Sequence, residues 1–202
     1  MANSAPSVMR FADLPIVPWK NGLGTTREIL AEPAGPGRDG FAWRLSMASI
    51  AADAPFSRYP GIRRHLAVVA GGAVELVVDE RTHPLGVGDA AVTFDGGSDA
   101  SARSLGEPAI DLNLMLDPTA FEGSLEPVAA GNVAIDSGCL ILVAVVPLRI
   151  RLEAGDSWEL GTLDALIAPA VERIVFQVLA TSASTTGPLA FAARLRPVVN
   201  VR

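Results

Sequence analysis

Apolar residues in this chain recur in short runs that alternate with turn-forming residues. The runs are rich in Val, Ile, Leu and Phe and are bounded by Gly, Pro, Asp and Ser, as expected of β-strands. They read FAWRLSMASI, RHLAVVAGGAVELVVD, DAAVTF, AIDLNLML, CLILVAVV, LRIRLE, ALIAP, RIVFQVLA and LAFAARLRPVV. Helical periodicity is weak, and the best candidate begins at Asp117, where Asp-Pro would cap a short helix over TAFEG. The pattern predicts an all-β protein built as a sandwich or barrel.

A faint internal repeat indicates two related β modules. Residues 85–90 read LGVGDA and residues 160–165 read LGTLDA, a spacing of 75, and a β-like run follows each copy. The segment between them, residues 117–133, would be the connector. Upstream of the two copies, the alternation predicts that Ala73, Val77 and Leu85 correspond to Leu148, Leu152 and Leu160.

Composition and charge limit the classes of partner. Half of the 202 residues are apolar and only 19% are charged, which favours a compact protein over a disordered one. The net charge of -6 comes from 22 acidic and 16 basic residues without runs of like charge, so neither nucleic acid nor a membrane is an expected partner. Exposed sheet edges favour pairing with another copy, so a homodimer is among the expected assemblies.

The expected location is the cytoplasm. The first ten residues, MANSAPSVMR, lack the pattern of an export signal. The longest apolar run, residues 139–148, is about half of the roughly 20 residues that a membrane crossing needs. Cys139 is the only cysteine and cannot form an intramolecular disulfide, so it is expected to be a small buried residue.

The sequence carries no strong signature of a metal, a cofactor or a nucleophile. Its two histidines, His65 and His83, are too few and too far apart for a typical transition-metal site, and no Gly-x-Ser-x-Gly elbow is present. KNGLGTT has the glycines of a phosphate loop, but Lys20 precedes both of them. We therefore expect no metal and no cofactor.

Polar chemistry concentrates in three β segments near the start of the chain. The first is residues 19–28, WKNGLGTTRE, in which Asn-Gly favours a tight turn and alternation then places Thr26, Glu28 and Leu30 on one face. The second is WRLS, residues 43–46. The third is PFSRYPGIRRH, residues 55–65, which is expected to place Arg63 and His65 on one side and Arg64 on the other.

Arginine is the informative residue type in these segments. A guanidinium can bind a carboxylate through two parallel hydrogen bonds, so a concave surface bearing Arg27, Arg44 or Arg64 would suit a small organic acid. The same arginines could instead pair with Glu28, Asp53 or Asp111 and brace the sheet. The sequence leaves both interpretations open.

These segments also carry a family resemblance. PWKNGLGTTREI, FAWRLSMASI, APFSRYPGIRRHLAVVAGG and IDLNLML follow one another in the order and spacing of the HutD/Ves family, over roughly residues 15–117. The resemblance implies a bicupin, two RmlC-like cupin β-barrel modules in one chain. The N-terminal module would comprise residues 1–117, and a connector with the C-terminal module would comprise residues 118–202. Leu23 and Ala54 stand where many members have glycine.

The resemblance implies a site without metal. One branch of the family is associated with histidine utilisation and a pathway acid such as urocanate or a formylated amino acid, and another with cold or stress response. No established reaction comes with the family. Its pattern falls on the following ligand-binding candidates: Trp19, Lys20, Asn21, Arg27, Glu28, Arg44, Ser46, Phe56, Ser57, Arg64, Asp111 and Asn113.

Three functions remain open from the sequence. The first is a metal-free module that binds a small carboxylate metabolite, with a regulatory or accessory role in amino-acid catabolism. Arg44 and Arg64 would clamp the acid against Trp19 or Phe56, while Asn21, Ser46 and Ser57 orient its polar end. The second is an isomerase or hydrolase that uses Lys20, Glu28 or His65 for proton transfer. The third is an interaction protein without a ligand.

Overall fold

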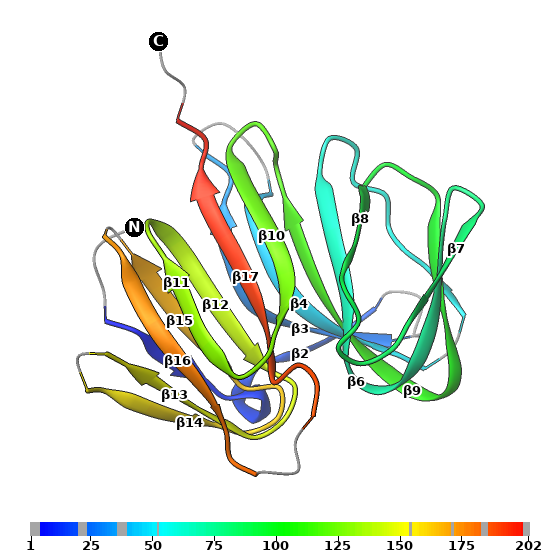
Figure 1. Cartoon of the computed structure of the whole chain (residues 1–202). Coiled ribbons are helices and arrows are strands. Elements are labelled where there is room, and N and C mark those ends of the chain that lie inside the picture. Colours follow the sequence, from blue (N-terminus) through cyan, green and yellow to red (C-terminus); the bar gives the residue numbers. More distant parts are fainter. Residues whose placement is uncertain are drawn as a thin grey trace. The chain divides into compact units, whose positions relative to one another are not determined.

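A computed structural model describes residues 5–19, 24–35, 40–51, 53–153, 155–170, 172–182 and 186–199. The described residues are dominated by β-strands, and the helical structure among them is one short 3-10 turn, η1 (Phe11–Asp13). The predicted all-β class is therefore confirmed (Figure 1). No helix in the described part of the chain has the length and hydrophobicity that a membrane crossing requires.

The strands form two compact modules. The first module comprises Leu14–Glu122 together with the described end of the chain, and the second comprises Gly123–Pro197 together with the described residues before Leu14. The sequence assigned those N-terminal residues to the first module. In the structure, β1 (Ser7–Met9) pairs with β15 (Ala165–Ala170), which places it in the second module.

The first module is one sheet whose main path runs β2-β3-β4-β9-β6-β7, with β5 attached to β9 and β8 attached to β6. Its core cluster includes Leu66 and Val68 from the first half of β6 and Leu76 from the second half. Because both halves of this long strand face one core, the sheet must bend between them. The strands are β2 (Ile16–Pro18), β3 (Gly24–Pro33), β4 (Phe41–Ile50), β5 (Ala54–Pro55), β6 (Arg63–Val78), β7 (Arg81–Leu85), β8 (Val92–Asp95) and β9 (Ala100–Leu116).

The bend lies where β6 and β9 cross at two glycines. The β6–β9 register shifts between Val68 and Ala70 and again between Gly71 and Ala73. Gly71 has a φ of +80°, and a Cβ atom there would lie 2.1 Å from the carbonyl oxygen of Pro108. Only glycine combines this left-handed backbone with so close an approach of a second chain segment. The AGGA in the middle of a long apolar run therefore marks the corner of the module.

Replacing Gly71 by alanine should destabilise the protein by about 2–4 kcal/mol, because the substitution adds backbone strain to a clash with a main-chain carbonyl. Gly35→Ala is the matched control, since a Cβ at Gly35 meets nothing within 4 Å and its φ is not in the left-handed region. Chemical denaturation of the two variants measures the difference. Equal stability of Gly71→Ala and the wild type would contradict this account of the bend.

The second module consists of a five-stranded sheet, β1-β15-β12-β17-β10, and a four-stranded sheet, β11-β16-β13-β14. One core cluster draws buried side chains from both sheets, for example Leu140 and Phe176, so the sheets enclose a common core. Cys139 is buried, as predicted. The remaining strands are β10 (Phe121–Val128), β11 (Gly131–Ile135), β12 (Gly138–Ala144), β13 (Leu148–Leu152), β14 (Ser157–Leu160), β16 (Ile174–Ala180) and β17 (Ala190–Pro197).

The predicted helix at Asp117 does not form. Oδ1 of Asp117 accepts hydrogen bonds from the backbone N–H and the hydroxyl of Thr119, at 2.8 and 2.7 Å, and closes a turn. β10 then begins at Phe121. The expected connector is thus largely a strand, because the aspartate stabilises a turn as readily as it would cap a helix.

The internal repeat has a structural counterpart. In each copy the glycine N–H donates to the aspartate three residues later: Gly86 to Asp89 at 2.7 Å and Gly161 to Asp164 at 2.9 Å. A hairpin precedes each turn, with Leu85 paired to Val74 and Leu160 paired to Leu148. The predicted correspondence upstream of the two copies is wrong by one residue. Val74 and Val78, and not Ala73 and Val77, occupy the places of Leu148 and Leu152. The difference arises because the loop of the second hairpin is one residue longer than that of the first.

Candidate functional site

The first module contains a concave cavity of about 610 Å³. Its walls come from β2, β3, β4, β9, the start of β6 and the loop between β5 and β6. This volume is in the range of small-molecule sites in proteins. The lining residues are Val17, Pro18, Trp19, Thr26, Glu28, Arg44, Ser46, Ala48, Pro55, Phe56, Ser57, Tyr59, Arg64, Asp111, Asn113 and Met115.

Strand register arranges the polar side chains of the cavity in rows. Met115 on β9 pairs with Arg44 of β4 on one side and with Arg64 of β6 on the other. Because neighbouring strands lie about 4.8 Å apart, the two arginine Cα atoms flank Met115 at about 10 Å from each other. Asn113 and Asp111 occupy the next two positions of β9 on the same face. One cavity wall thus carries two cations, an amide and a carboxyl group.

The opposite face of the same strands is apolar. Trp43, Leu45, Leu112 and Leu114 alternate with the polar residues and are fully buried. This strict alternation fixes the register, since a slip by one residue would turn the apolar set into the cavity. The predicted two-face pattern of WRLS is therefore confirmed, and so is the placement of Arg64 opposite its neighbours in IRRH.

Neither cavity arginine has a carboxylate partner among the described residues. The Arg44 guanidinium lies over the rings of Phe41 and Tyr59, at 4.8 and 5.8 Å from their centroids, and donates to the sulfur of Met115 at 3.3 Å.

Arg64 is likewise held by rings rather than by an ion pair. Its guanidinium lies 4.7 Å from the Phe56 centroid and 5.1 Å from the Phe94 centroid, and its strongest polar contact is a long 3.5 Å bond to the carbonyl of Ser57. The Nε atoms of both cavity arginines are buried without a hydrogen-bond partner in the described structure. Stacking on rings holds guanidiniums in place but leaves their donor edges available.

Burial dominates the electrostatics of the cavity wall. It raises the pKa of Asp111 to about 7, although the charge of Arg64 and a 3.0 Å hydrogen bond from the Ala48 N–H both favour the ionised form. It also lowers the pKa of Arg64 to about 10, against the opposing effect of Asp111. Both shifts favour the neutral form of the group. The attraction between Arg64 and Asp111 therefore does not compensate for their removal from water.

An indole ring forms another wall of the cavity. The Trp19 Nε1–H donates to the hydroxyl of Thr26 at 2.7 Å. A Cβ atom on Gly24 would lie 2.9 Å from this ring and 2.7 Å from the carbonyl of Ser49, so glycine is needed for the ring to pack there. Trp19 and Phe56 both line the cavity and supply flat apolar surface.

The structure brings nine of the twelve predicted site residues together around the cavity. Arg27 is not among the lining residues; its Nη1 donates to the carbonyl of Leu14 at 2.6 Å. Lys20 and Asn21 lie outside the described residues. The nine are Trp19, Glu28, Arg44, Ser46, Phe56, Ser57, Arg64, Asp111 and Asn113.

The alternation predicted for residues 25–30 holds only as far as Glu28. The β3–β4 register shifts between Glu28 and Leu30, so Ile29 is buried while Leu30 is only partly buried. A β-bulge inserts one residue and reverses the facing of those that follow. Leu30 therefore does not continue the face of Thr26 and Glu28.

Sequence reasoning missed several lining residues. Met115 lies two residues after Asn113 and four after Asp111, so the period of a strand could have identified it. The alternation placed Thr26 on the face of Glu28, but Thr26 was not among the predicted site residues. Tyr59 lies in the loop before β6, where no periodic pattern applies, and its position could not be read from the sequence.

His65 and the potential metal ligands lie away from this chemistry. His65 is not a lining residue; its Nδ1 is 2.8 Å from the Thr93 hydroxyl, and burial and the charge of Arg63 lower its pKa. No group of three His, Cys, Asp or Glu side chains converges within the described ranges.

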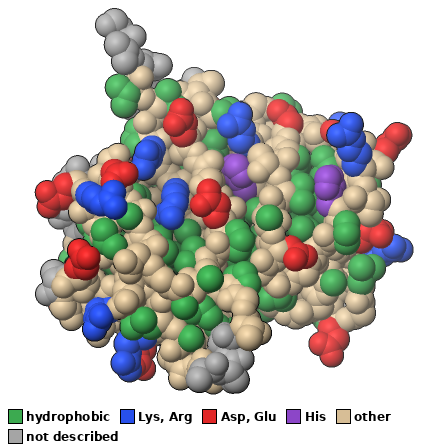
Figure 2. All heavy atoms as spheres, in the orientation of Figure 1, with side chains coloured by type: hydrophobic (Ala, Val, Ile, Leu, Met, Phe, Trp, Pro, Cys, Tyr) green, Lys and Arg blue, Asp and Glu red, His purple; other side chains and the backbone are tan. Residues whose placement is uncertain are grey.

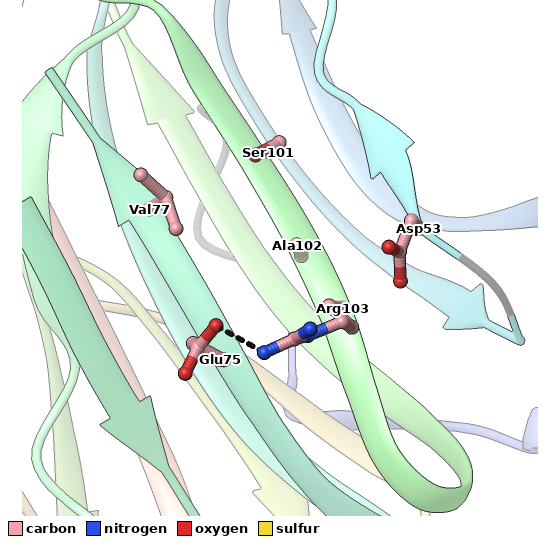
Figure 3. A pocket seen from close by; sticks show the side chains of 6 residues that line it. All are labelled: Asp53, Glu75, Val77, Ser101, Ala102 and Arg103. Atoms are coloured by element: carbon pink, nitrogen blue, oxygen red, sulfur yellow. Dashed lines mark hydrogen bonds and ion pairs between the residues drawn. The ribbon is translucent and has the colours of Figure 1, made fainter. Parts of the chain in front are cut away.

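A second hollow in the first module, of about 220 Å³, is lined by charged residues that already interact. Arg103 reaches Glu75 at 2.7 Å, with Asp53 on the other side of the hollow (Figure 3). Both members of this ion pair are partly exposed, so the hollow offers no unpaired buried group. On the molecular face shown in Figure 2, basic and acidic side chains are interspersed and form no large patch of one sign.

The second module does not repeat the polar wall. Its strands β12 and β17 correspond to β6 and β9, with Leu140 in the core position of Leu66. Register then sets Ala192 in the place of Asp111 and Gly138 in the place of Arg64. The positions of Arg64 and Asp111 therefore carry no charge in the second module, whereas Arg194, whose Nη1 is buried without a hydrogen-bond partner among the described residues, takes the place of Asn113.

Comparisons with known proteins agree with this architecture. The HutD family model matches residues 11–186. A Pseudomonas putida protein described as an uncharacterised 21.2 kDa protein in the hutC 3′ region is 39% identical over 162 residues, which are 79% of this chain and 84% of that protein. Protein Ves of Citrobacter koseri is 41% identical over 104 residues, which are 50% of this chain and 53% of Ves.

The fold comparison extends over nearly the whole chain. The structure of HutD from Pseudomonas fluorescens SBW25, described for a formate condition, has a TM-score of 0.82 at 27% identity, and the match covers 96% of this chain and all of that one. Other solved structures of low sequence identity share the same fold. The predicted two-module cupin architecture is confirmed.

Proposed function

The chain belongs to the HutD family, and we propose that its first module binds a small organic acid in the cavity between Trp19, Arg44 and Arg64. A single observation carries the proposal: two guanidiniums line a concave, partly apolar cavity, and neither is paired with a carboxylate of the described chain. A buried cation without an anionic partner costs several kcal/mol, and a bound carboxylate would remove that cost.

The chemistry of the walls fits such a ligand. Planar guanidiniums form paired hydrogen bonds with carboxylates, and the rings of Trp19 and Phe56 suit the carbon skeleton of the acid. Ser46 and Ser57 would orient its polar end. The P. putida relative is described by its position in the hutC 3′ region, which supports a regulatory or accessory role in histidine catabolism for this chain.

Titration calorimetry with formate, acetate and propionate tests the proposal. We expect saturable one-to-one binding that strengthens from formate to propionate, because the longer acids bury more apolar surface against the rings. High salt should weaken binding, because it screens the attraction between the acid and the two guanidiniums. Absence of saturable binding for all three acids would contradict the proposal.

A further inference from the structure

The charges of the cavity wall are not balanced. Arg44 and Arg64 contribute two cations, while Asp111 is the one acidic side chain on this wall that is withdrawn from water. Glu28 also lines the cavity but is exposed, so solvent screens its charge. With Asp111 ionised, Arg44, Arg64 and Asp111 together carry a net charge of one positive unit. A ligand with a single negative charge would neutralise it.

Asp111 lines the cavity and also has a carboxylate oxygen without a hydrogen-bond partner among the described residues. Its Oδ1 accepts the Ala48 N–H at 3.0 Å, but its Oδ2 is buried without a hydrogen-bond partner among the described residues. The same holds for Oδ1 of its neighbour Asn113, whose amide can present either edge to a ligand. A buried acceptor of this kind favours a ligand that donates a hydrogen bond.

The acceptor lies at the far end of the wall from the arginine row. Asp111 is four residues from Met115 along β9, and Arg64 acts on Asp111 through its charge without forming an ion pair. The space between a carboxylate held by the guanidiniums and the Asp111 oxygen therefore suits a short carbon chain. A carboxylate at one end of this chain would bind the guanidiniums, and a hydrogen-bond donor at its other end would bind the Asp111 oxygen.

Building on the proposed function, we infer that Asp111 sets ligand selectivity: the cavity takes a monocarboxylate that carries an N–H or O–H donor at the other end of a short carbon chain, and it rejects dicarboxylates. A second carboxylate would lie beside the ionised Asp111, and like charges in a buried site repel strongly. An amide or hydroxyl at the same place would instead donate to Oδ2.

Three ligands of similar size separate these effects. Succinamate has one carboxylate and an amide donor, succinate has a second carboxylate in place of the amide, and monomethyl succinate has one carboxylate and no donor. Calorimetry at about pH 8.5, where Asp111 is ionised, should show succinamate binding about tenfold or more tightly than either of the others. Asp111→Asn should lose the preference for succinamate over succinate, because its amide can donate to a carboxylate.

A pH series gives a second readout. The titratable and charged groups that line the cavity with Asp111 are Arg44 on β4, Arg64 on β6, Glu28 on β3 and Tyr59 in the loop between β5 and β6. Because the pKa of Asp111 is about 7, its carboxyl group gains a proton as the pH falls to about 6 and can then donate to succinate. The wild-type discrimination against succinate should shrink over this interval, and that of Asp111→Asn should stay constant after correction for ligand protonation.

The results separate the selectivity set by Asp111 from acid binding itself. Equal binding of all three ligands, or unchanged selectivity in Asp111→Asn, overturns this inference and leaves acid binding intact. Binding of acetate without binding of any of the three overturns it as well. Failure of acetate, propionate and all three larger ligands to bind contradicts the proposed function, and this inference with it. Thermal unfolding of each variant confirms that the cavity is folded.

Discussion

Arg64→Ala should weaken the binding of propionate by about 100-fold or more and leave the stability of the protein within about 1 kcal/mol of the wild type. Truncating one partner of a buried, charge-assisted contact typically costs 2–5 kcal/mol of affinity. Stability should change little because Arg64 has no carboxylate partner in the described chain. The variant loses the stacking on Phe56 and Phe94, the long hydrogen bond to the Ser57 carbonyl and the attraction of Asp111, but it also removes the cost of burying the guanidinium. Calorimetry and chemical denaturation measure the two quantities.

Arg63→Ala is the matched control. Arg63 precedes Arg64 on β6, points to the opposite face and is exposed. Its removal changes the net charge by the same amount, so an effect of overall charge would appear in both variants. A loss of more than about 3 kcal/mol of stability in Arg64→Ala with acid binding retained would identify Arg64 as a structural brace.

Asp111→Asn should stabilise the protein at pH values above neutrality. The folded-state pKa of Asp111 is raised from 3.8 to about 7, chiefly by burial. Between these values the folded state holds a proton that the unfolded state has lost, so the free energy of unfolding falls as the pH rises through this interval. Above about pH 7 the full cost of burying the carboxylate is present, on the order of a few kcal/mol. Asparagine keeps the acceptor for the Ala48 N–H and removes that cost.

Thermal unfolding from about pH 4 to about pH 9 checks this result. The unfolding midpoint of Asp111→Asn should exceed that of the wild type by roughly 5 °C or more at high pH, and the two should converge at low pH, where the wild-type carboxyl group is also neutral. An exposed acid such as Asp95 serves as the control, because Asp95→Asn removes a charge without relieving burial. A difference that is independent of pH would show that Asp111 does not titrate in the folded state as described.

The two variants also test whether stability and binding oppose each other. In the wild type, burial of Arg64 and Asp111 costs more than their mutual attraction returns. Such a cost is tolerated where a ligand completes the site, and binding sites commonly trade stability for function in this way. Arg64→Ala and Asp111→Asn should therefore alter affinity or selectivity while stability stays level or rises.

Strand alternation predicted most of the site and its facing. WRLS and IRRH each have one clear two-residue period, and both place their arginines as the sequence indicated. The same rule fails after Glu28, where a bulge reverses the alternation. Bulges depend on how a neighbouring strand pairs, and the local sequence does not carry that information.

Other features depend on contacts that are distant in the sequence. The pairing of β1 with β15 joins residues near the N-terminus to the second module, and Asp164 anchors that segment through Arg10 at 2.7 Å. The repeat predicted the turn containing Asp164 but not what would bind to it. The helix predicted at Asp117 failed for a related reason, since the strand after the turn gains hydrogen bonds from a partner far along the chain.

The central claim, that an acid binds between the guanidiniums of Arg44 and Arg64, is tested most directly by a crystal structure of the protein soaked in a mixture of acetate, propionate and succinamate. The account predicts density for a carboxylate within hydrogen-bond distance of both side chains, with the carbon skeleton against Trp19 or Phe56. Guanidiniums without bound acid at saturating concentrations, or an acid bound elsewhere on the protein, would contradict it.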